Sequence, residues 1–157
     1  MKITSSYKVQ IKQYRHIFDD TVRIYRDAVD FLISVCLENW NEISALDGML
    51  LRKSYVENLI HKTKEHPHPK YEFDAVFYKF PSYLRRDAIA CAIGKVSSHK
   101  SSLSNWEASD MTTRGAEPGI PKAGFEFPCM YKTVMYQRTD EYSCKVKVWI
   151  RNTWDWI

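Results

Sequence analysis

The stretch EYSCKVKVWIRNTWDWI, residues 141–157, decides the kind of fold that the chain is expected to have. Its side chains alternate between two sides of an extended backbone, which is typical of a β-strand with one buried face. Two tryptophans follow, so the chain stops on an unfinished hydrophobic strand. The apolar side holds Tyr142, Cys144, Val146, Val148 and Ile150, the basic side holds Ser143, Lys145, Lys147, Trp149 and Arg151, and the two tryptophans are Trp154 and Trp156.

The start of the chain has the same character. In ITSSYKVQIK, residues 3–12, apolar side chains alternate with polar ones that include Lys8 and Lys12. A further strand is expected around CMYKTVMYQR, residues 129–138, and a tight turn in TDEY, residues 139–142, joins it to the last strand. The simplest packing pairs the N-terminal strand with these late strands.

Between the strands, the hydrophobic period becomes that of a helix. Apolar residues at steps of three and four predict a first helix from Asp20 to about Ala45. Asp19 or Asp20 is expected at its N-cap, and the Asp47-Gly48 pair is expected to stop it. The chain therefore reads as an α+β fold in which helices are inserted between strands.

Two further helices are expected after this stop. A short one covers RKSYVENLIHKT, residues 52–63, and Ser82 is placed as the N-cap of a long one over residues 83–106. One side of the long helix is unusually small, and it is either a solvated face or a place where a polymer backbone comes close. These small residues are Ala90, Gly94, Ser97, Ser98 and Ser101.

The composition bounds the class of protein. The chain has 157 residues, of which 45% are hydrophobic, so it can bury a core. Its longest nearly apolar run, AVDFLISVCL, is interrupted by Asp30 and Ser34 and is too short for a bilayer, and no secretory signal is expected. The four cysteines form no CxxC pair, which indicates a reducing, cytoplasmic setting.

The net charge of +4 is unevenly distributed. Residues 13–47 carry three bases and seven acids, whereas residues 1–12 and 142–151 carry bases and no acid. Such segregation suggests a polyanion as the partner of the strands. Lysines interleaved with aromatic rings, as around Trp149, favour nucleic acid, although lysines on strands also protect edges and aid solubility.

The sequence contains no recognisable catalytic set. It has no glycine-rich phosphate loop, no GxSxG motif and no HExxH motif. His61, His66 and His68 lie near two prolines without a cysteine or acid at ligand spacing, so a polar loop is a better interpretation than a metal site. The chain as it stands is expected not to be an enzyme and to need no cofactor or metal.

The order of the elements resembles the N-terminal region of the TnpB (OrfB) proteins of insertion sequences, which are relatives of the type V CRISPR effector nucleases. The resemblance covers nearly the whole chain and implies an antiparallel, wedge-like β-barrel interrupted by a helical recognition insert. It gives a first strand at residues 1–12, the insert at residues 13–110, and a glycine- and proline-containing connector with the remaining strands at residues 111–157. The stretches that carry it are YKVQIK, YRDAVDFLISVCLENWNEI, FPSYLRRDAIACAIGKVSSHKSSLSNW, PGIPKAGFEFP and YSCKVKVWIRNTWDW.

In that family, this region holds a guide RNA and reads a short motif beside the DNA target, and a later RuvC-like domain cuts. The resemblance therefore implies a non-catalytic module that binds guide RNA and target DNA and is truncated before the nuclease domain. The residues placed at the DNA motif are Ser82, Tyr83, Arg85 and Arg86, each arginine being alternatively a partner for Asp87 or Glu107. The candidates for RNA or heteroduplex contacts are Lys8, Lys12, Lys122, Lys145, Lys147, Trp149 and Arg151.

A second interpretation belongs to another class of protein. The chain would be a protein-interaction or regulatory module, with the acidic first helix and exposed Trp154 and Trp156 at its interface. The expected truncation, for its part, predicts self-association through the C-terminal strand, because Trp154, Trp156 and Ile157 would lack the domain that covers them in a longer protein.

Overall fold

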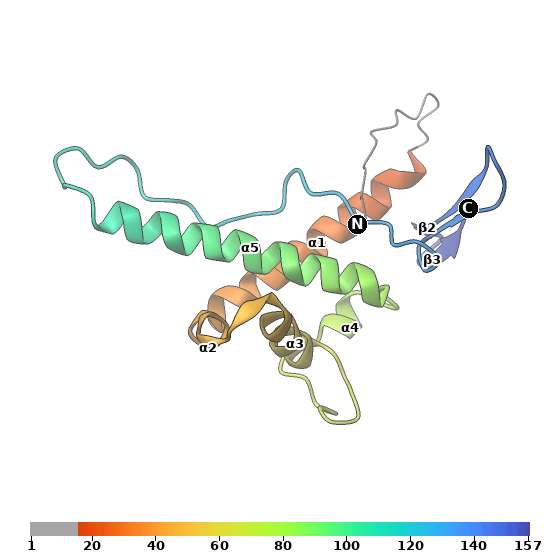
Figure 1. Ribbon diagram of the computed structural model, residues 1–157, viewed down its shortest axis with the longest axis horizontal. Coiled ribbons are helices and arrows are strands. Elements are labelled where there is room, and N and C mark those ends of the chain that lie inside the picture. The colour runs from red at the N-terminus through yellow and green to blue at the C-terminus, as the bar shows by residue number, and fades with distance from the viewer. Residues whose placement is uncertain (1–15) are drawn as a thin grey trace, which may run out of the picture.

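The computed structural model describes residues 16–157, and the expected first strand, with Lys8 and Lys12, lies outside the described residues. The mixed α+β class is confirmed (Figure 1). Two long helices cross, shorter helices lie on one side of them, and a small sheet lies beside their N-terminal ends. The elements are α1 (Ile17–Glu38), α2 (Trp40–Ala45), α3 (Gly48–Ile60), α4 (Phe73–Val76), α5 (Ser82–Glu107), β1 (Tyr136–Arg138), β2 (Cys144–Ile150) and β3 (Thr153–Trp156).

The first predicted helix is two helices, because the chain breaks at Asn39. The buried Asn39 side chain donates hydrogen bonds to the Val35 carbonyl at 2.7 Å and to the Tyr71 hydroxyl at 2.8 Å. An amide that bonds to nearby backbone competes with helix continuation, and Asn39 has φ −115°. Asp19 and Asp20 lie in the first turn of α1 rather than at its N-cap, where they still face the positive end of the helix.

The core forms where α1 crosses α5. Both helices direct a stripe of fully buried side chains into one cluster, which Val56 and Ile60 of α3 extend. Tyr25 of α1 is buried, and its hydroxyl donates a hydrogen bond to Asp87 of α5 at 2.6 Å. The pKa of the Tyr25 hydroxyl is raised far above its usual range. Burial is the largest cause, and the hydrogen bond to the Asp87 carboxylate is the next.

The long helix α5 begins as predicted, but Ser82 is not its cap. Pro81 is the N-cap residue, with φ −59° and ψ 132°, and its carbonyl accepts the Arg85 N–H at 2.9 Å. The extended conformation that a cap needs is the one that proline adopts readily, so Ser82 becomes the first helical residue. Its side chain makes no capping hydrogen bond.

The described strands form an open sheet in the order β1-β2-β3, with antiparallel neighbours. An open sheet is not a closed barrel, so the described residues correct that part of the expectation. β1 pairs over Tyr136–Arg138 only, and β2 and β3 are joined by a two-residue turn at Arg151 and Asn152. Both turn residues are left-handed, at φ 51° and 60°, which is the geometry that tight hairpins require.

The hairpin overturns the expectation of exposed C-terminal tryptophans. The turn sends β3 back along β2, so Trp154 pairs with Trp149 and lies only 9% exposed in the core cluster. Its ring stands edge to face against Phe80 at 5.4 Å and against Trp149 at 5.6 Å. Trp156 is half-buried. The Trp154 ring is therefore not free to take part in the predicted self-association, which stays a prediction for Trp156 and for Ile157, a residue that is 41% exposed.

The glycine- and proline-containing connector returns along α5 towards the sheet (Figure 1). Side chains of both long helices hold it. Asp30 of α1 accepts the Ala123 N–H at 2.6 Å, Arg26 donates to the Glu126 carbonyl at 3.0 Å, and Lys95 of α5 forms an ion pair with the Glu126 carboxylate. Part of the charge on the acidic helix is thus used to bind the chain itself.

Candidate nucleic-acid interface

A polar cleft of about 400 Å³ lies at the N-terminal end of α5, against α3. Three of the four residues that were predicted to meet DNA line this cleft together: Ser82, Arg85 and Arg86. They lie close to one another because all three are at the start of α5. From α3 come Ser54, Glu57 and Asn58, and His61 and Thr63 follow that helix. We call this the α5 cleft.

The α5 cleft carries an excess of positive charge. Arg85 pairs with one oxygen of the Glu57 carboxylate at 2.9 Å, and Arg86 reaches the other oxygen at 3.4 Å. Two guanidinium groups therefore share one carboxylate. His61 at the cleft wall is paired with Asp74 at 2.7 Å. The first N–H groups of α5 add the positive end of a helix dipole, so the cleft suits an anion.

The two arginines differ in what they can contact. The Arg85 side chain is only 6% exposed and its Nε has no hydrogen-bond partner, so its main role is to join α5 to α3. Its partner is Glu57 rather than Asp87 or Glu107. Burial of this kind argues against a direct DNA contact by Arg85. The Arg86 side chain is 54% exposed and remains available to a ligand.

Tyr83 lies outside the α5 cleft. Its ring is 40% exposed, stacks at a tilt on Tyr131 at 5.2 Å, and has the Arg86 guanidinium 5.9 Å from its centroid. An aromatic ring beside an exposed arginine can contact a base or sugar at the edge of the α5 cleft.

The predicted basic face of the last strand is only partly formed. Lys145 and Lys147 share one face of β2 with Trp149, as the alternation requires. Lys145 is exposed, and Lys147 is half-buried with its Nζ 6.0 Å from the centroid of Trp156. Trp149, however, packs on Trp154 towards the helices, and Arg151 lies in the hairpin turn. Lys122 is exposed on the connector, where its carbonyl accepts a hydrogen bond from Lys95 at 3.1 Å.

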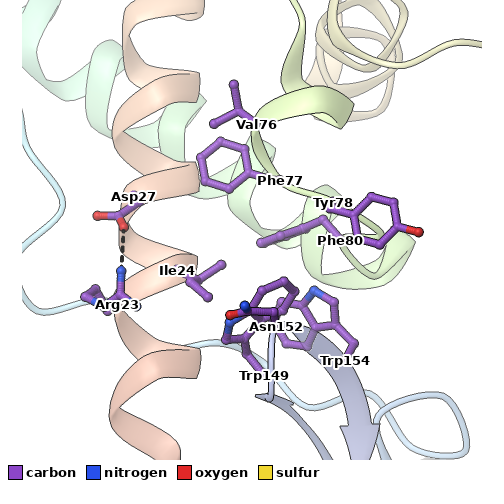
Figure 2. A pocket seen from close by; sticks show the side chains of 10 residues that line it. All are labelled: Arg23, Ile24, Asp27, Val76, Phe77, Tyr78, Phe80, Trp149, Asn152 and Trp154. Carbon is purple, nitrogen blue, oxygen red and sulfur yellow. Dashed lines mark ion pairs between the residues drawn. The ribbon is translucent and has the colours of Figure 1, made fainter.

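A second cleft, of about 470 Å³, is lined by aromatic rings (Figure 2). The rings come from the α4 region and from the β2-β3 hairpin, and α1 forms the third wall. No sequence pattern indicates this site, because its walls lie far apart in the chain. The rings are Phe77, Tyr78, Phe80, Trp149 and Trp154, and the polar rim consists of Arg23, Asp27 and Asn152. We call this the aromatic cleft.

Comparison with known proteins places the chain in a family. The profile of the Aq_aa04 family matches residues 3–150. The chain belongs to the Aq_aa04 family. It is similar to the uncharacterized protein aq_aa04 of Aquifex aeolicus (strain VF5), with 27% identity over 135 residues, which are 79% of this chain and 76% of that protein. No solved structure matches the chain.

The structure of this Aq_aa04 family member bears on metal binding and on membrane-spanning helices. Within residues 16–157, no group of three or more His, Cys, Asp or Glu side chains is arranged to hold a metal ion. Of the three loop histidines, His61 pairs with Asp74, and His66 and His68 are exposed. None of the helices in the same range is both long and apolar enough to cross a membrane.

Proposed function

We propose that the chain is a nucleic-acid-binding module that holds a structured RNA and contacts a DNA duplex, and that it corresponds to the wedge and recognition-insert region of a TnpB-like protein. The observation that carries this proposal is the shared carboxylate of the α5 cleft. Arg85 and Arg86 divide Glu57 between them at the start of a 26-residue helix. One positive charge beside a helix N-terminus is a good site for a phosphate.

DNA and RNA are proposed to bind at two different surfaces of the chain. Arg86, with Ser82 and Tyr83 beside it, contacts DNA at the α5 cleft, and Arg85 positions that turn by its ion pair with α3. Lys145 and Lys147 on β2, Arg151 in the hairpin turn and Lys122 on the connector contact the RNA backbone through charge. Trp149 is assigned no stacking role, because its ring is half-buried against Trp154.

The module is also proposed to be non-catalytic. In TnpB-like proteins, cutting belongs to a RuvC-like domain, and this chain is expected to leave DNA and RNA intact in the presence of magnesium or manganese. Cleavage by a clean preparation that disappears when one acid of this chain is replaced would contradict this.

The test is a titration of alanine variants against structured RNA and duplex DNA at several salt concentrations. Loss of Lys145 or Lys147 should weaken RNA binding about equally across sequences and lower the salt slope by roughly one unit for each lysine, because one fewer counterion is released. Arg86→Ala should cost about 1–3 kcal/mol on a preferred DNA and relax the preference. Lys64→Ala, in the exposed loop after α3, is the matched control that should change neither.

If the Lys145 and Lys147 variants bind RNA with the parent's affinity and salt slope, the lysines act only in solubility, and the proposed RNA contact is wrong. If Arg86→Ala leaves DNA binding unchanged, the α5 cleft is a structural ion pair rather than a binding site.

A further inference from the structure

The α5 cleft is lined by hydrogen-bond donors from two sides. The start of α5 contributes the Arg86 guanidinium and the Ser82 hydroxyl, and the α3 side contributes the Ser54 and Thr63 hydroxyls and the Asn58 amide. The first N–H groups of α5 add to them, because a helix leaves its N-terminal donors without helical partners. The cleft therefore offers many donors to a ligand, and its one carboxylate is already shared by two arginines.

Arg85 adds a donor that the chain itself leaves unpaired. Its side chain lines the cleft and is only 6% exposed, and its Nε–H has no acceptor among the described residues. The guanidinium pairs with Glu57 through a terminal nitrogen instead, at 2.9 Å. A buried donor without an acceptor is unfavourable, and a ligand oxygen in the cleft would supply the acceptor. This observation is independent of the helix N-terminus and points to the same kind of ligand, an anion with several oxygens.

The charge of the cleft favours an anion that carries more than one negative charge. Arg85 and Arg86 leave an excess of one positive charge over Glu57, and the positive end of the α5 dipole adds to it. A phosphate monoester carries about −1.5 to −2 charges near neutral pH and has three strong acceptor oxygens. A backbone phosphate carries a single charge and has fewer free oxygens, so the monoester matches the donors of the cleft better.

The size of the cleft favours the end of a strand over its middle. Its volume is about 400 Å³, and its walls come from α3 and α5. A phosphate inside a strand is joined to sugars on both sides and stays at the rim, where only the exposed Arg86 can reach it. A terminal phosphate is joined to the strand on one side only, so it can enter between the two helices and approach Arg85.

We infer that the α5 cleft binds a terminal phosphate of a DNA end, which accepts hydrogen bonds from Arg86, from Ser82 and from the first N–H groups of α5. The inference rests on the proposed DNA contact at this cleft, and it adds which group of the DNA enters the cleft. The base pairs that Arg86 would distinguish are then those beside the end of the duplex.

The experiment compares three forms of one DNA hairpin, which has a dye in its loop and a single blunt end. The blunt end carries a phosphate on its 5′ side, a phosphate on its 3′ side, or hydroxyls only. Fluorescence anisotropy with the full chain should show that one phosphorylated form binds roughly tenfold tighter than the hydroxyl form, through additional charge-assisted hydrogen bonds. The two phosphorylated forms distinguish which end of a strand enters the cleft. Equal affinities of the three forms would overturn the inference.

Two variants test whether the preference for a phosphate arises in the cleft. Arg86→Ala should bind the phosphorylated and hydroxyl forms about equally, because the exposed guanidinium is gone. Ser82→Ala should reduce the preference by about two- to fivefold through the lost hydroxyl and leave the hydroxyl form unaffected. Ser104→Ala, exposed near the other end of α5, is the matched control and should change nothing. Thermal melting verifies that each variant is folded, and a preference that survives Arg86→Ala would overturn the inference.

Competition shows what carries the phosphate. A dinucleotide with the favoured terminal phosphate should displace the hairpin at a lower concentration than inorganic phosphate does, because its sugars and bases add contacts. Displacement by inorganic phosphate at the same or a lower concentration would mean that the cleft takes a free ion. Displacement by a phosphoserine peptide at a lower concentration than the dinucleotide would mean that the cleft takes a phosphoprotein. Either result would overturn the inference.

The failure of the inference and the failure of the proposed function give different results. If the parent binds all three forms alike and Arg86→Ala weakens all of them, DNA contacts the cleft without an end, so the inference is wrong and the proposed DNA contact stands. If the parent binds no form of the hairpin, the proposed DNA contact itself is wrong.

Discussion

The backbone N–H of Trp149 donates a hydrogen bond to the hydroxyl oxygen of Thr21 at 2.8 Å, although 128 residues separate them in the chain. β1 covers one edge of β2 only as far as Met135, whose carbonyl accepts the Lys147 N–H at 2.8 Å. At Trp149, the next donor on that edge, the side chain of a helix takes the place of a strand. Thr21 is 1% exposed, so α1 closes the sheet edge with a buried polar contact.

Replacing this hydroxyl should destabilise the fold. Thr21→Val keeps the shape of the side chain but leaves the Trp149 N–H without an acceptor, which should cost about 1–3 kcal/mol in the free energy of unfolding. Urea denaturation measures the change. Thr139→Val, on an exposed loop between β1 and β2, is the control and should change stability by less than about 0.5 kcal/mol. Equal effects of the two substitutions would mean that the edge contact contributes nothing.

The ion pair between α3 and α5 gives a second prediction. Glu57→Gln should destabilise the fold by about 3–5 kcal/mol, because it leaves the buried Arg85 guanidinium without a countercharge. Arg86→Gln removes the exposed member of the same cluster and should stay within about 0.5 kcal/mol of the parent. Thermal or urea unfolding measures the loss of stability in each of the two variants. A small change in the free energy of unfolding of Glu57→Gln would show that water reaches Arg85 and replaces the carboxylate.

Alternation along the last strand predicts β2 correctly, but it cannot tell which face meets the helices. The sequence places Trp149 with Lys145 and Lys147, and the structure keeps them on one face. The end of that face at Trp149 packs on Trp154, however, whereas Lys145 is exposed. One face of a strand can be apolar at one end and solvated at the other, and only the position of α1 and Phe80 determines where the change occurs.

The hairpin shows a second limit of sequence reasoning. Tight two-residue turns are usually recognised by glycine, and this one is built from Arg151 and Asn152, so the sequence gives no signal that the strand ends there. The α5 cleft could be predicted only in part. Ser82, Arg85 and Arg86 could be placed together because they lie at the start of one helix.

Glu57 could not be placed with them, since no sequence pattern links this residue of α3 to α5. The aromatic cleft was missed for the same reason, as its walls come from three distant segments.

Three of the four free cysteines should react with a thiol reagent in a fixed order. Cys144 is exposed in β2 and should react first. Burial and the nearby Asp87 charge raise the pKa of the Cys129 thiol, so it should react more slowly despite its exposure. Burial raises the pKa of the Cys36 thiol to about 12, and this residue should react only after unfolding. Peptide mass spectrometry after timed iodoacetamide treatment gives the order, with the urea-unfolded chain as the control in which all four react.

The connector should make stability depend on pH through Glu126. Burial acts to raise the pKa of its carboxyl, but hydrogen bonds from Lys95 and from backbone N–H groups outweigh it and hold the pKa below its usual value. The Gly124 N–H donates to the Glu126 carboxylate at 2.8 Å, and the Phe125 N–H donates to the same oxygen at 3.2 Å. A carboxyl whose folded pKa is lowered stabilises the fold above its unfolded pKa, at about 4.3, and loses that contribution as the pH falls through the folded pKa.

The expected result is a pH-dependent difference between the parent and Glu126→Gln. Above about pH 5 the parent should be the more stable, because its carboxylate keeps the ion pair with Lys95. As the pH falls further, the carboxyl becomes protonated and the two free energies of unfolding should converge. Urea denaturation at a series of pH values measures both curves. Glu117→Gln, exposed on the same connector, should run parallel to the parent throughout. A Glu126→Gln difference that stays constant down to the lowest pH would instead assign the loss to packing, and the ion pair would not be what holds the connector.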